Sequence, residues 1–246
     1  IPVSELERVL DQKPIALLLT EPGYLGTISE LPALISKAHE NSIPVIIDAA
    51  WGGHFGFNSQ IPKHVMQLGA DALITSVHKA LPGYSASALL LAQGKYLSLA
   101  RIEQSFETTH TTSPAGAPLA SIDGCRALLE TRGDQLTGEL LQYVKDFKRE
   151  VQSHFDSEIF LNPEQFAAGR FDPVKIVLRA NVLGLSGVDV EKELQKANIR
   201  VEMADRDTIV FLATLADNAD DFAELAQALV PILKALQGAP DRKSVV

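Results

Sequence analysis

The sequence predicts an α/β fold, with a parallel-rich sheet in the first part of the chain and a small α+β unit after it. Short apolar runs alternate with amphipathic segments over residues 15–75, in the order strand, helix, strand, helix, strand. Later in the chain the order becomes strand, helix, two strands and a final helix. We therefore expect a large domain over residues 1–150 and a small C-terminal domain over residues 151–246, ending in a tail from Gly238.

The first strand and helix are predicted from local patterns. Residues 15–19 are uniformly apolar and run into a Glu-Pro-Gly turn, which is typical of a strand covered on both faces of a parallel sheet. Apolar residues then recur at helical spacing from Leu31 to Ala38. Ser29 precedes this segment, and we expect it to cap the helix N-terminus.

Polar residues follow the next two strands. The strand at residues 45–47 ends at Asp48, and the strand at residues 72–75 is followed by Ser-Val-His-Lys, which ends at Lys79. Ligands bind beyond the carboxyl ends of strands in such sheets, so we expect Asp48 and Lys79 at one ligand-binding edge. A fourth strand is expected at residues 88–92, and a mainly helical stretch follows it.

Composition excludes several classes of protein. The 246 residues have a net charge of −9, which disfavours a nucleic-acid partner. A single cysteine, Cys125, excludes an internal disulfide framework and indicates a reducing, cytoplasmic setting. No apolar run approaches the ~20 residues that a membrane helix needs, so no membrane partner is expected.

Lys79 and Asp48 are the candidate reactive residues. A lysine held between an apolar strand and a Pro-Gly turn is a usable nucleophile toward an aldehyde. An aspartate at the end of a buried strand is well placed to keep the ring nitrogen of pyridoxal phosphate (PLP) protonated. The plain alternatives are a solvated loop lysine and a turn aspartate.

The two motifs together resemble a known enzyme family. Asp-Ala-Ala-Trp at residues 48–51 and Ser-Val-His-Lys at residues 76–79 are similar to motifs of the fold-type-I PLP enzymes, and more narrowly of the bacterial ornithine/lysine/arginine decarboxylases. Supporting similarity lies at residues 20–26, 53–55, 69–71, 111–114 and 182–187. The resemblance covers most of the chain. It implies part of a PLP-dependent transferase-like large domain, followed by a small α+β C-terminal domain.

The resemblance assigns a role to each residue of these motifs. It makes Lys79 the lysine that binds the cofactor aldehyde covalently, Asp48 the partner of the pyridine nitrogen, and Ala50 a small residue packed against the ring. Ser76 and His78 would contact the cofactor phosphate or the substrate carboxylate. Lys79, His78 and Asp48 are the expected catalytic residues.

Further residues would complete the pocket. Trp51 stands where many relatives have histidine, and its indole would form a wall of the pocket; a plain core tryptophan is the alternative. His54 is a weaker candidate for the same pocket. Thr111 and Thr112 would reach the cofactor of a neighbouring subunit, which implies a homodimer or a higher homo-oligomer. Their plain alternative is a helix N-cap.

The implied activity is PLP-dependent decarboxylation of a small basic amino acid, arginine, lysine or ornithine, to its amine, as in polyamine biosynthesis. An aminotransferase or a carbon-sulfur lyase of the same fold would need Lys79 and Asp48 equally. The family places its phosphate-binding loop before the region that this chain begins with. We therefore expect the chain to be the C-terminal portion of a longer polypeptide, and a truncated, non-catalytic relative stays open.

Other motifs point elsewhere but are incomplete. Ser76 and Lys79 match Ser-x-x-Lys of penicillin-binding enzymes, yet the companion motifs Ser-Asp-Asn and Lys-Thr-Gly are absent from the sequence. His39-Glu40 lacks a second histidine at zinc-ligand spacing, and no metal is expected. No Gly-x-Gly-x-x-Gly follows the first strand, which argues against a nicotinamide dehydrogenase.

Overall fold

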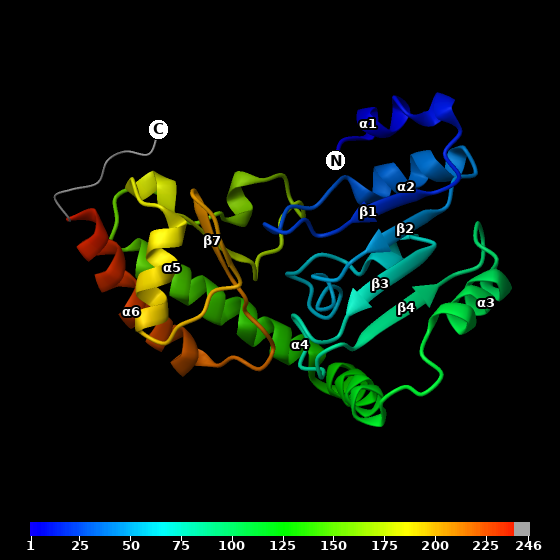
Figure 1. Cartoon of the computed structure of the whole chain (residues 1–246). Helices are drawn as coiled ribbons and strands as arrows, with labels where there is room; N and C mark the ends of the chain where they lie inside the picture. Colours follow the sequence, from blue (N-terminus) through cyan, green and yellow to red (C-terminus); the bar gives the residue numbers. More distant parts are fainter. Residues whose placement is uncertain (239–246) are drawn as a thin grey trace. The chain divides into compact units, whose positions relative to one another are not determined.

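The computed structural model describes residues 1–238, which form two units (Figure 1). Unit 1 comprises residues 1–138, 166–173 and 214–216, and the remaining described residues form unit 2. The expected domain boundary at residue 150 stays a prediction. The expected C-terminal tail lies, beyond Gly238, outside the described residues.

Unit 1 contains a four-stranded mixed sheet in the order β1-β2-β3-β4. Its strands are β1 (Leu17–Thr20), β2 (Val45–Asp48), β3 (Ala72–Ser76) and β4 (Ala88–Ala92). The first three run parallel, as predicted, whereas β4 runs antiparallel to β3. The return is antiparallel because a loop of residues 77–87, and not a crossover helix, joins β3 to β4. The predicted parallel-rich α/β sheet is confirmed.

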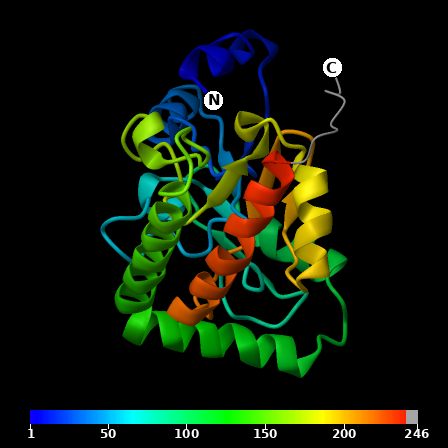
Figure 2. The ribbon, with the colours of Figure 1, turned by 90° about the vertical axis from the view of Figure 1, so that its left-hand side faces the viewer.

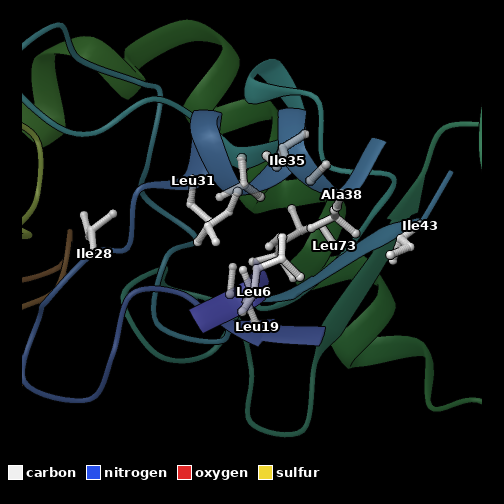
Figure 3. Close-up of a cluster of buried hydrophobic side chains, with 14 of the residues drawn as sticks. Leu6, Leu19, Ile28, Leu31, Ile35, Ala38, Ile43 and Leu73 are labelled. Carbon is white, nitrogen blue, oxygen red and sulfur yellow. The ribbon is translucent and has the colours of Figure 1, made fainter. Parts of the chain in front are cut away.

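Helices cover one face of this sheet. The helix α2 (Leu31–Glu40) lies between β1 and β2 along the chain, and the short helices α1 (Val3–Glu7) and η2 (Val65–Leu68) flank it. Side chains of α2 pack with residues of the strands in one buried cluster. Figure 3 shows Leu31, Ile35 and Ala38 of α2 gathered with Leu6, Leu19 and Leu73. Burial of this apolar surface is the main force that fixes the sheet under α2.

Two predictions for this region were wrong. Within residues 1–238 the strand β1 is covered on one face only, since Leu18 is 66% exposed, and Ile15 lies outside the strand with 94% of its surface exposed. Apolar composition alone does not show which face a helix covers. Ser29 does not cap α2, which begins after Glu30 without a side-chain cap and has Pro32 in its first turn. Proline lacks an N–H, so it reduces the need for a cap.

Two longer helices follow β4 along the chain, and the short helix η1 (Leu10–Gln12) follows α1. The two longer helices are α3 (Leu99–Thr109) and α4 (Gly116–Gln152), of which α4 continues into unit 2. They confirm the predicted helical stretch. Thr111 and Thr112 do not cap α4, because the helix begins at Gly116. Among the described helices, none is both long and apolar enough to cross a membrane.

Unit 2 has a three-stranded antiparallel sheet in the order β5-β7-β6, consistent with the predicted α+β unit. Its elements are β5 (Ile176–Arg179), α5 (Gly187–Lys196), β6 (Met203–Ala204), β7 (Thr208–Phe211) and α6 (Ala219–Gln237). The helices α5 and α6 lie side by side, in yellow and red in Figure 2. The strand expected at residues 200–203 is shorter and begins only at Met203.

Residues 166–173 belong to unit 1, although the chain on either side of them belongs to unit 2. The segment is held by a bridge between Phe171 and Thr27, and by the backbone N–H of Asp172, which donates to the carbonyl of Gly26 at 2.8 Å. The carboxylate Oδ1 of Asp172 lies 3.1 Å from Nε2 of His54, and both side chains are buried. A polar pair shielded from water in this way links residues 118 positions apart.

We expect Asp172→Ala to lower the free energy of unfolding of unit 1 by about 3 kcal/mol, because it leaves the buried His54 without this partner. Asp172→Asn keeps the shape of the side chain and one polar contact, so it should lower the free energy of unfolding by less. Trp51 is the only tryptophan of the chain and lies in unit 1, so its fluorescence during urea denaturation reports this unit. Equal losses for the two variants would contradict the role of the pair.

The packed face of the sheet gives a second prediction. Ile47 is fully buried in the α2 cluster, whereas Leu18 on the opposite face is 66% exposed. Ile47→Ala should lower the free energy of unfolding by about 2–5 kcal/mol, and Leu18→Ala by no more than about 0.5 kcal/mol. Urea denaturation monitored by Trp51 fluorescence measures both. A loss for Leu18→Ala as large as that for Ile47→Ala would show that the other face is also packed.

Candidate active site

The loops that follow β1, β2 and β3 begin at the same edge of the sheet. In the parallel register Asp48 is paired with Thr20 on one side and with Ile74 on the other. Two backbone bonds continue the ladder past the strands: Glu21 donates to the carbonyl of Asp48 at 2.9 Å, and Ala49 donates to the carbonyl of Ile74 at 2.7 Å. The three loops after these strands therefore begin side by side, at the same edge of the sheet.

Asp48 is partly buried at the last position of β2. Its Oδ1 accepts a hydrogen bond from the backbone N–H of Ala50 at 3.1 Å, which is the geometry of a turn aspartate. The hydroxyl of Thr75 donates to the carbonyl of Ala49 at 3.0 Å and ties this turn to β3. The turn fixes where the carboxylate lies, so the structural and the catalytic interpretations of Asp48 are compatible.

Lys79 lies in a tight loop, residues 77–83, after β3. The N–H of Gly83 donates to the carbonyl of Val77 at 2.7 Å and closes the loop. A Cβ on residue 83 would lie 2.4 Å from that carbonyl oxygen, so no residue larger than glycine fits there without a shift. This closure, and the bond from Val77 N–H to the carbonyl of Ser87 at 3.0 Å, limit the positions open to the backbone of Lys79.

His78 has a defined ring orientation. Its Nδ1 lies 2.7 Å from the backbone carbonyl of Ser87, and because a carbonyl only accepts, Nδ1 is the donor. The second ring nitrogen, Nε2, is therefore the one that can accept a proton or a hydrogen bond from a ligand. The ring is partly exposed, so a ligand can reach it.

Lys79 and Trp51 are in direct contact. The amine Nζ of Lys79 lies 4.5 Å from the centroid of the Trp51 ring, which is a cation–π geometry. Trp51 in turn meets the ring of Tyr24 edge to face, with centroids 5.5 Å apart and planes at 88°. Tyr24, Trp51 and Lys79 follow β1, β2 and β3 respectively, so the contacts connect all three loops.

The loop that contains Tyr24 is held by a buried carboxylate. Both side-chain oxygens of Glu21 accept the N–H of Ser29, at 3.1 and 3.0 Å, and Glu21 is only 2% exposed. Burial raises the pKa of this carboxyl above its ordinary value, while the bonds from Ser29 and the nearby Arg170 lower it. The Glu21–Ser29 contact thus joins the two ends of the loop formed by residues 21–29.

The structure places six of the predicted site residues at this edge, at the ends of β2 and β3 or on the loops that follow them. They are Asp48, Ala50, Trp51, Ser76, His78 and Lys79. Gly53 is also close, since a Cβ there would lie 3.1 Å from the carbonyl oxygen of Ser76. Thr111 and Thr112 lie apart from these loops in the sequence, in the exposed segment between α3 and α4, and their roles stay predictions.

The sequence alone missed two features of this region. Tyr24 lies within a stretch that resembles the family, but only its position after β1, at the ligand edge, could have singled it out. Asp172 follows an irregular stretch and has no local pattern that connects it with His54. His54 itself lies buried beside Phe55 and Asp172, and its weaker candidacy for the pocket stays a prediction.

The residue types at this edge fit PLP. An amine that lies on an indole face can meet an aldehyde, and a carboxylate at the end of the neighbouring strand can face a protonated ring nitrogen. His78 Nε2 and the Ser76 hydroxyl add groups that bind phosphate or carboxylate. Because residue 83 is glycine, this loop turns back without placing a side chain at the edge of the sheet.

Comparison with known proteins identifies relatives over most of the chain. The chain is 33% identical over 244 residues to an arginine decarboxylase of Bacillus subtilis, a match that covers 96% of this chain and 49% of the relative. The chain thus spans about half the length of the curated relatives that it matches.

Solved structures share the fold. Lysine decarboxylase A of Pseudomonas aeruginosa superposes with a TM-score of 0.78 at 17% identity, covering 95% of this chain and 40% of that one. An alanine–glyoxylate aminotransferase of Nostoc sp. superposes with a TM-score of 0.70 at 17% identity, covering 94% and 65%. At such identities the likeness shows the fold alone.

The sequence profile described as "Orn/Lys/Arg decarboxylase, major domain" matches residues 4–168. Decarboxylases of this family and the aminotransferases of the same fold are PLP-dependent enzymes. The family expected from the motifs at residues 48–51 and 76–79 is therefore confirmed: the chain belongs to the Orn/Lys/Arg decarboxylase family.

Proposed function

We propose that this chain provides the lysine and the aspartate of a PLP-dependent decarboxylase that converts a basic amino acid into its amine. The observation that supports the proposal most is the position of Lys79, whose amine lies on the Trp51 ring in the loop next to Asp48. These residues stand at the ligand edge of a sheet whose sequence belongs to a decarboxylase family. When bound, PLP supplies an electron sink for the bond that breaks at the α-carbon.

Each side chain has a distinct task in this proposal. Lys79 would hold the aldehyde group of PLP through Nζ, and the same amine would move a proton at that atom. Asp48 holds a proton on the pyridine nitrogen, and its bond from the Ala50 N–H fixes the carboxylate for that contact. His78, fixed through Nδ1 by Ser87, presents Nε2 to the substrate, and Ser76 offers a hydroxyl to the phosphate. Ala50 leaves room for the ring, and Trp51 closes one side of the pocket.

The substrate is proposed to be arginine, lysine or ornithine. Support comes from the relatives, which include arginine decarboxylases by sequence and lysine decarboxylases by fold. The proposed enzyme acts in the cytoplasm, in amine and polyamine formation. It is proposed to be a homodimer or a higher homo-oligomer in which Thr111 and Thr112, from an exposed segment, reach the cofactor of the neighbouring subunit.

There are two alternatives to this proposal. An aminotransferase needs the same lysine and aspartate, and an aminotransferase shares this fold with a TM-score of 0.70. A truncated, non-catalytic relative is the second, and it stays open because no cofactor contact of Lys79 or Asp48 has been measured. Release of carbon dioxide separates the decarboxylase from the aminotransferase, and covalent fixation of PLP separates both from the non-catalytic relative.

We expect Lys79→Ala to abolish the imine absorbance of the PLP-treated chain and to lower carbon dioxide release by about 10²–10⁴-fold, because the amine that binds the aldehyde and moves the proton is gone. Lys63→Ala is the matched control, since Lys63 is an exposed lysine of the same unit. Carbon dioxide release from arginine, lysine and ornithine is compared in parallel. Reduction of the PLP-treated chain with borohydride, followed by peptide mass spectrometry, shows which lysine is modified.

The outcomes separate the candidates. Loss of both signals in Lys79→Ala only, with carbon dioxide released by the unaltered chain, supports the proposal. Transfer of the amino group to a keto acid without carbon dioxide supports the aminotransferase. Equal modification of Lys79 and Lys63 by PLP in the unaltered chain would contradict any cofactor role for Lys79.

A further inference from the structure

Tyr24, Trp51 and Lys79 form one continuous array across three loops. The Tyr24 ring meets the Trp51 ring edge to face at 5.5 Å and 88°, and the Lys79 amine lies 4.5 Å from the centroid of the same indole. The indole therefore has a defined neighbour on the β1 loop and a defined neighbour on the β3 loop. A change at one end of such an array can reach the other end through the shared ring.

We infer that Tyr24 is a positioning residue, which sets the orientation of the Trp51 ring and thereby the position of the Lys79 amine at the ligand edge. The electropositive edge of one ring favours the electronegative face of the other, so the perpendicular contact selects one tilt of the indole. The ammonium group is attracted to the face of the indole, so it follows that tilt.

The β1 loop is built to hold Tyr24 in place. Glu21 and Ser29 close the loop through two buried hydrogen-bond contacts, and Gly26 donates its N–H to the carbonyl of Gly23 at 2.8 Å directly beside Tyr24. A Cβ on Gly52 would lie 3.1 Å from Cδ of Pro22, so the β1 and β2 loops also pack closely next to the two rings. Tyr24 thus contacts Trp51 from a loop of restricted geometry, although the residue is 38% exposed.

The contribution of Tyr24 to PLP chemistry rests on the proposed function, but its action on Trp51 and Lys79 is measurable without cofactor. The chain has one tryptophan, so acrylamide quenching of its fluorescence reports Trp51 alone. Tyr24→Phe keeps the ring and should leave quenching unchanged. Tyr24→Leu keeps apolar bulk without the ring, and should raise the quenching constant by about two- to fivefold as the indole loses its preferred tilt.

The second readout is the rate at which formaldehyde with cyanoborohydride methylates Lys79, relative to Lys63 in the same sample. An amine held against the indole reacts slowly because the ring covers it. Tyr24→Leu and Trp51→Leu should each raise this relative rate severalfold, and Tyr24→Leu should add nothing in the Trp51→Leu background, since Tyr24 acts through Trp51. Tyr84→Leu, at a tyrosine that is 63% exposed in the same unit, is the control.

The inference is supported if Tyr24→Leu changes both readouts while Tyr24→Phe and Tyr84→Leu change neither. In addition, the variant with both Tyr24→Leu and Trp51→Leu should have the same Lys79 methylation rate as Trp51→Leu alone. It is overturned if Tyr24→Leu changes neither readout, if it changes Trp51 quenching but not the Lys79 rate, or if its effect persists without Trp51. Borohydride fixation of PLP on Lys79 is scored separately. A chain that fails to fix PLP but passes these tests refutes the proposed function and leaves the role of Tyr24 intact.

Discussion

The parallel register of β1, β2 and β3 is the constraint on which the site depends. It places Thr20, Asp48 and Ile74 at one level, so that the three loops beyond them start side by side. The backbone bonds from Glu21 to Asp48 and from Ala49 to Ile74 extend that order past the strands. Because side chains of a strand alternate between faces, a shift of one residue in β2 would turn Asp48 to the α2 side of the sheet. Burial of the α2 cluster holds the register in place.

Within this frame, each loop fixes one group by local bonds. The β3 loop turns back through Gly83 into an antiparallel β4, and the bonds from Val77 and His78 to Ser87 join its two sides. The β2 turn fixes the Asp48 carboxylate through Ala50. The rings of Trp51 and Tyr24 then connect the loops through side chains. The amine and the carboxylate thus lie on neighbouring strand ends and loops, and the sheet register and the Trp51 contact together determine the relation between them.

Much of this was predictable because its cause is local in the sequence. Strands β2, β3 and β4, the helix α2 and the positions of Asp48 and Lys79 follow from apolar runs, helical spacing and turn residues. The direction of β4 and the uncovered face near Leu18 were not predictable, because they depend on which elements pack together. Ser29 has the residue type of a cap, yet the N-cap position of α2 is Glu30, and the Ser29 N–H donates to Glu21. The Tyr24–Trp51 and His54–Asp172 contacts join distant residues, and no sequence pattern encodes them.

A crystal structure of the chain with PLP would show whether one PLP ring lies between Lys79 and Asp48. We expect continuous electron density from Nζ of Lys79 to the aldehyde carbon of the cofactor, with the Asp48 carboxylate within hydrogen-bond distance of the pyridine nitrogen. Cofactor bound to another lysine, or an Asp48 carboxylate turned away from a ring that is bound to Lys79, would contradict it.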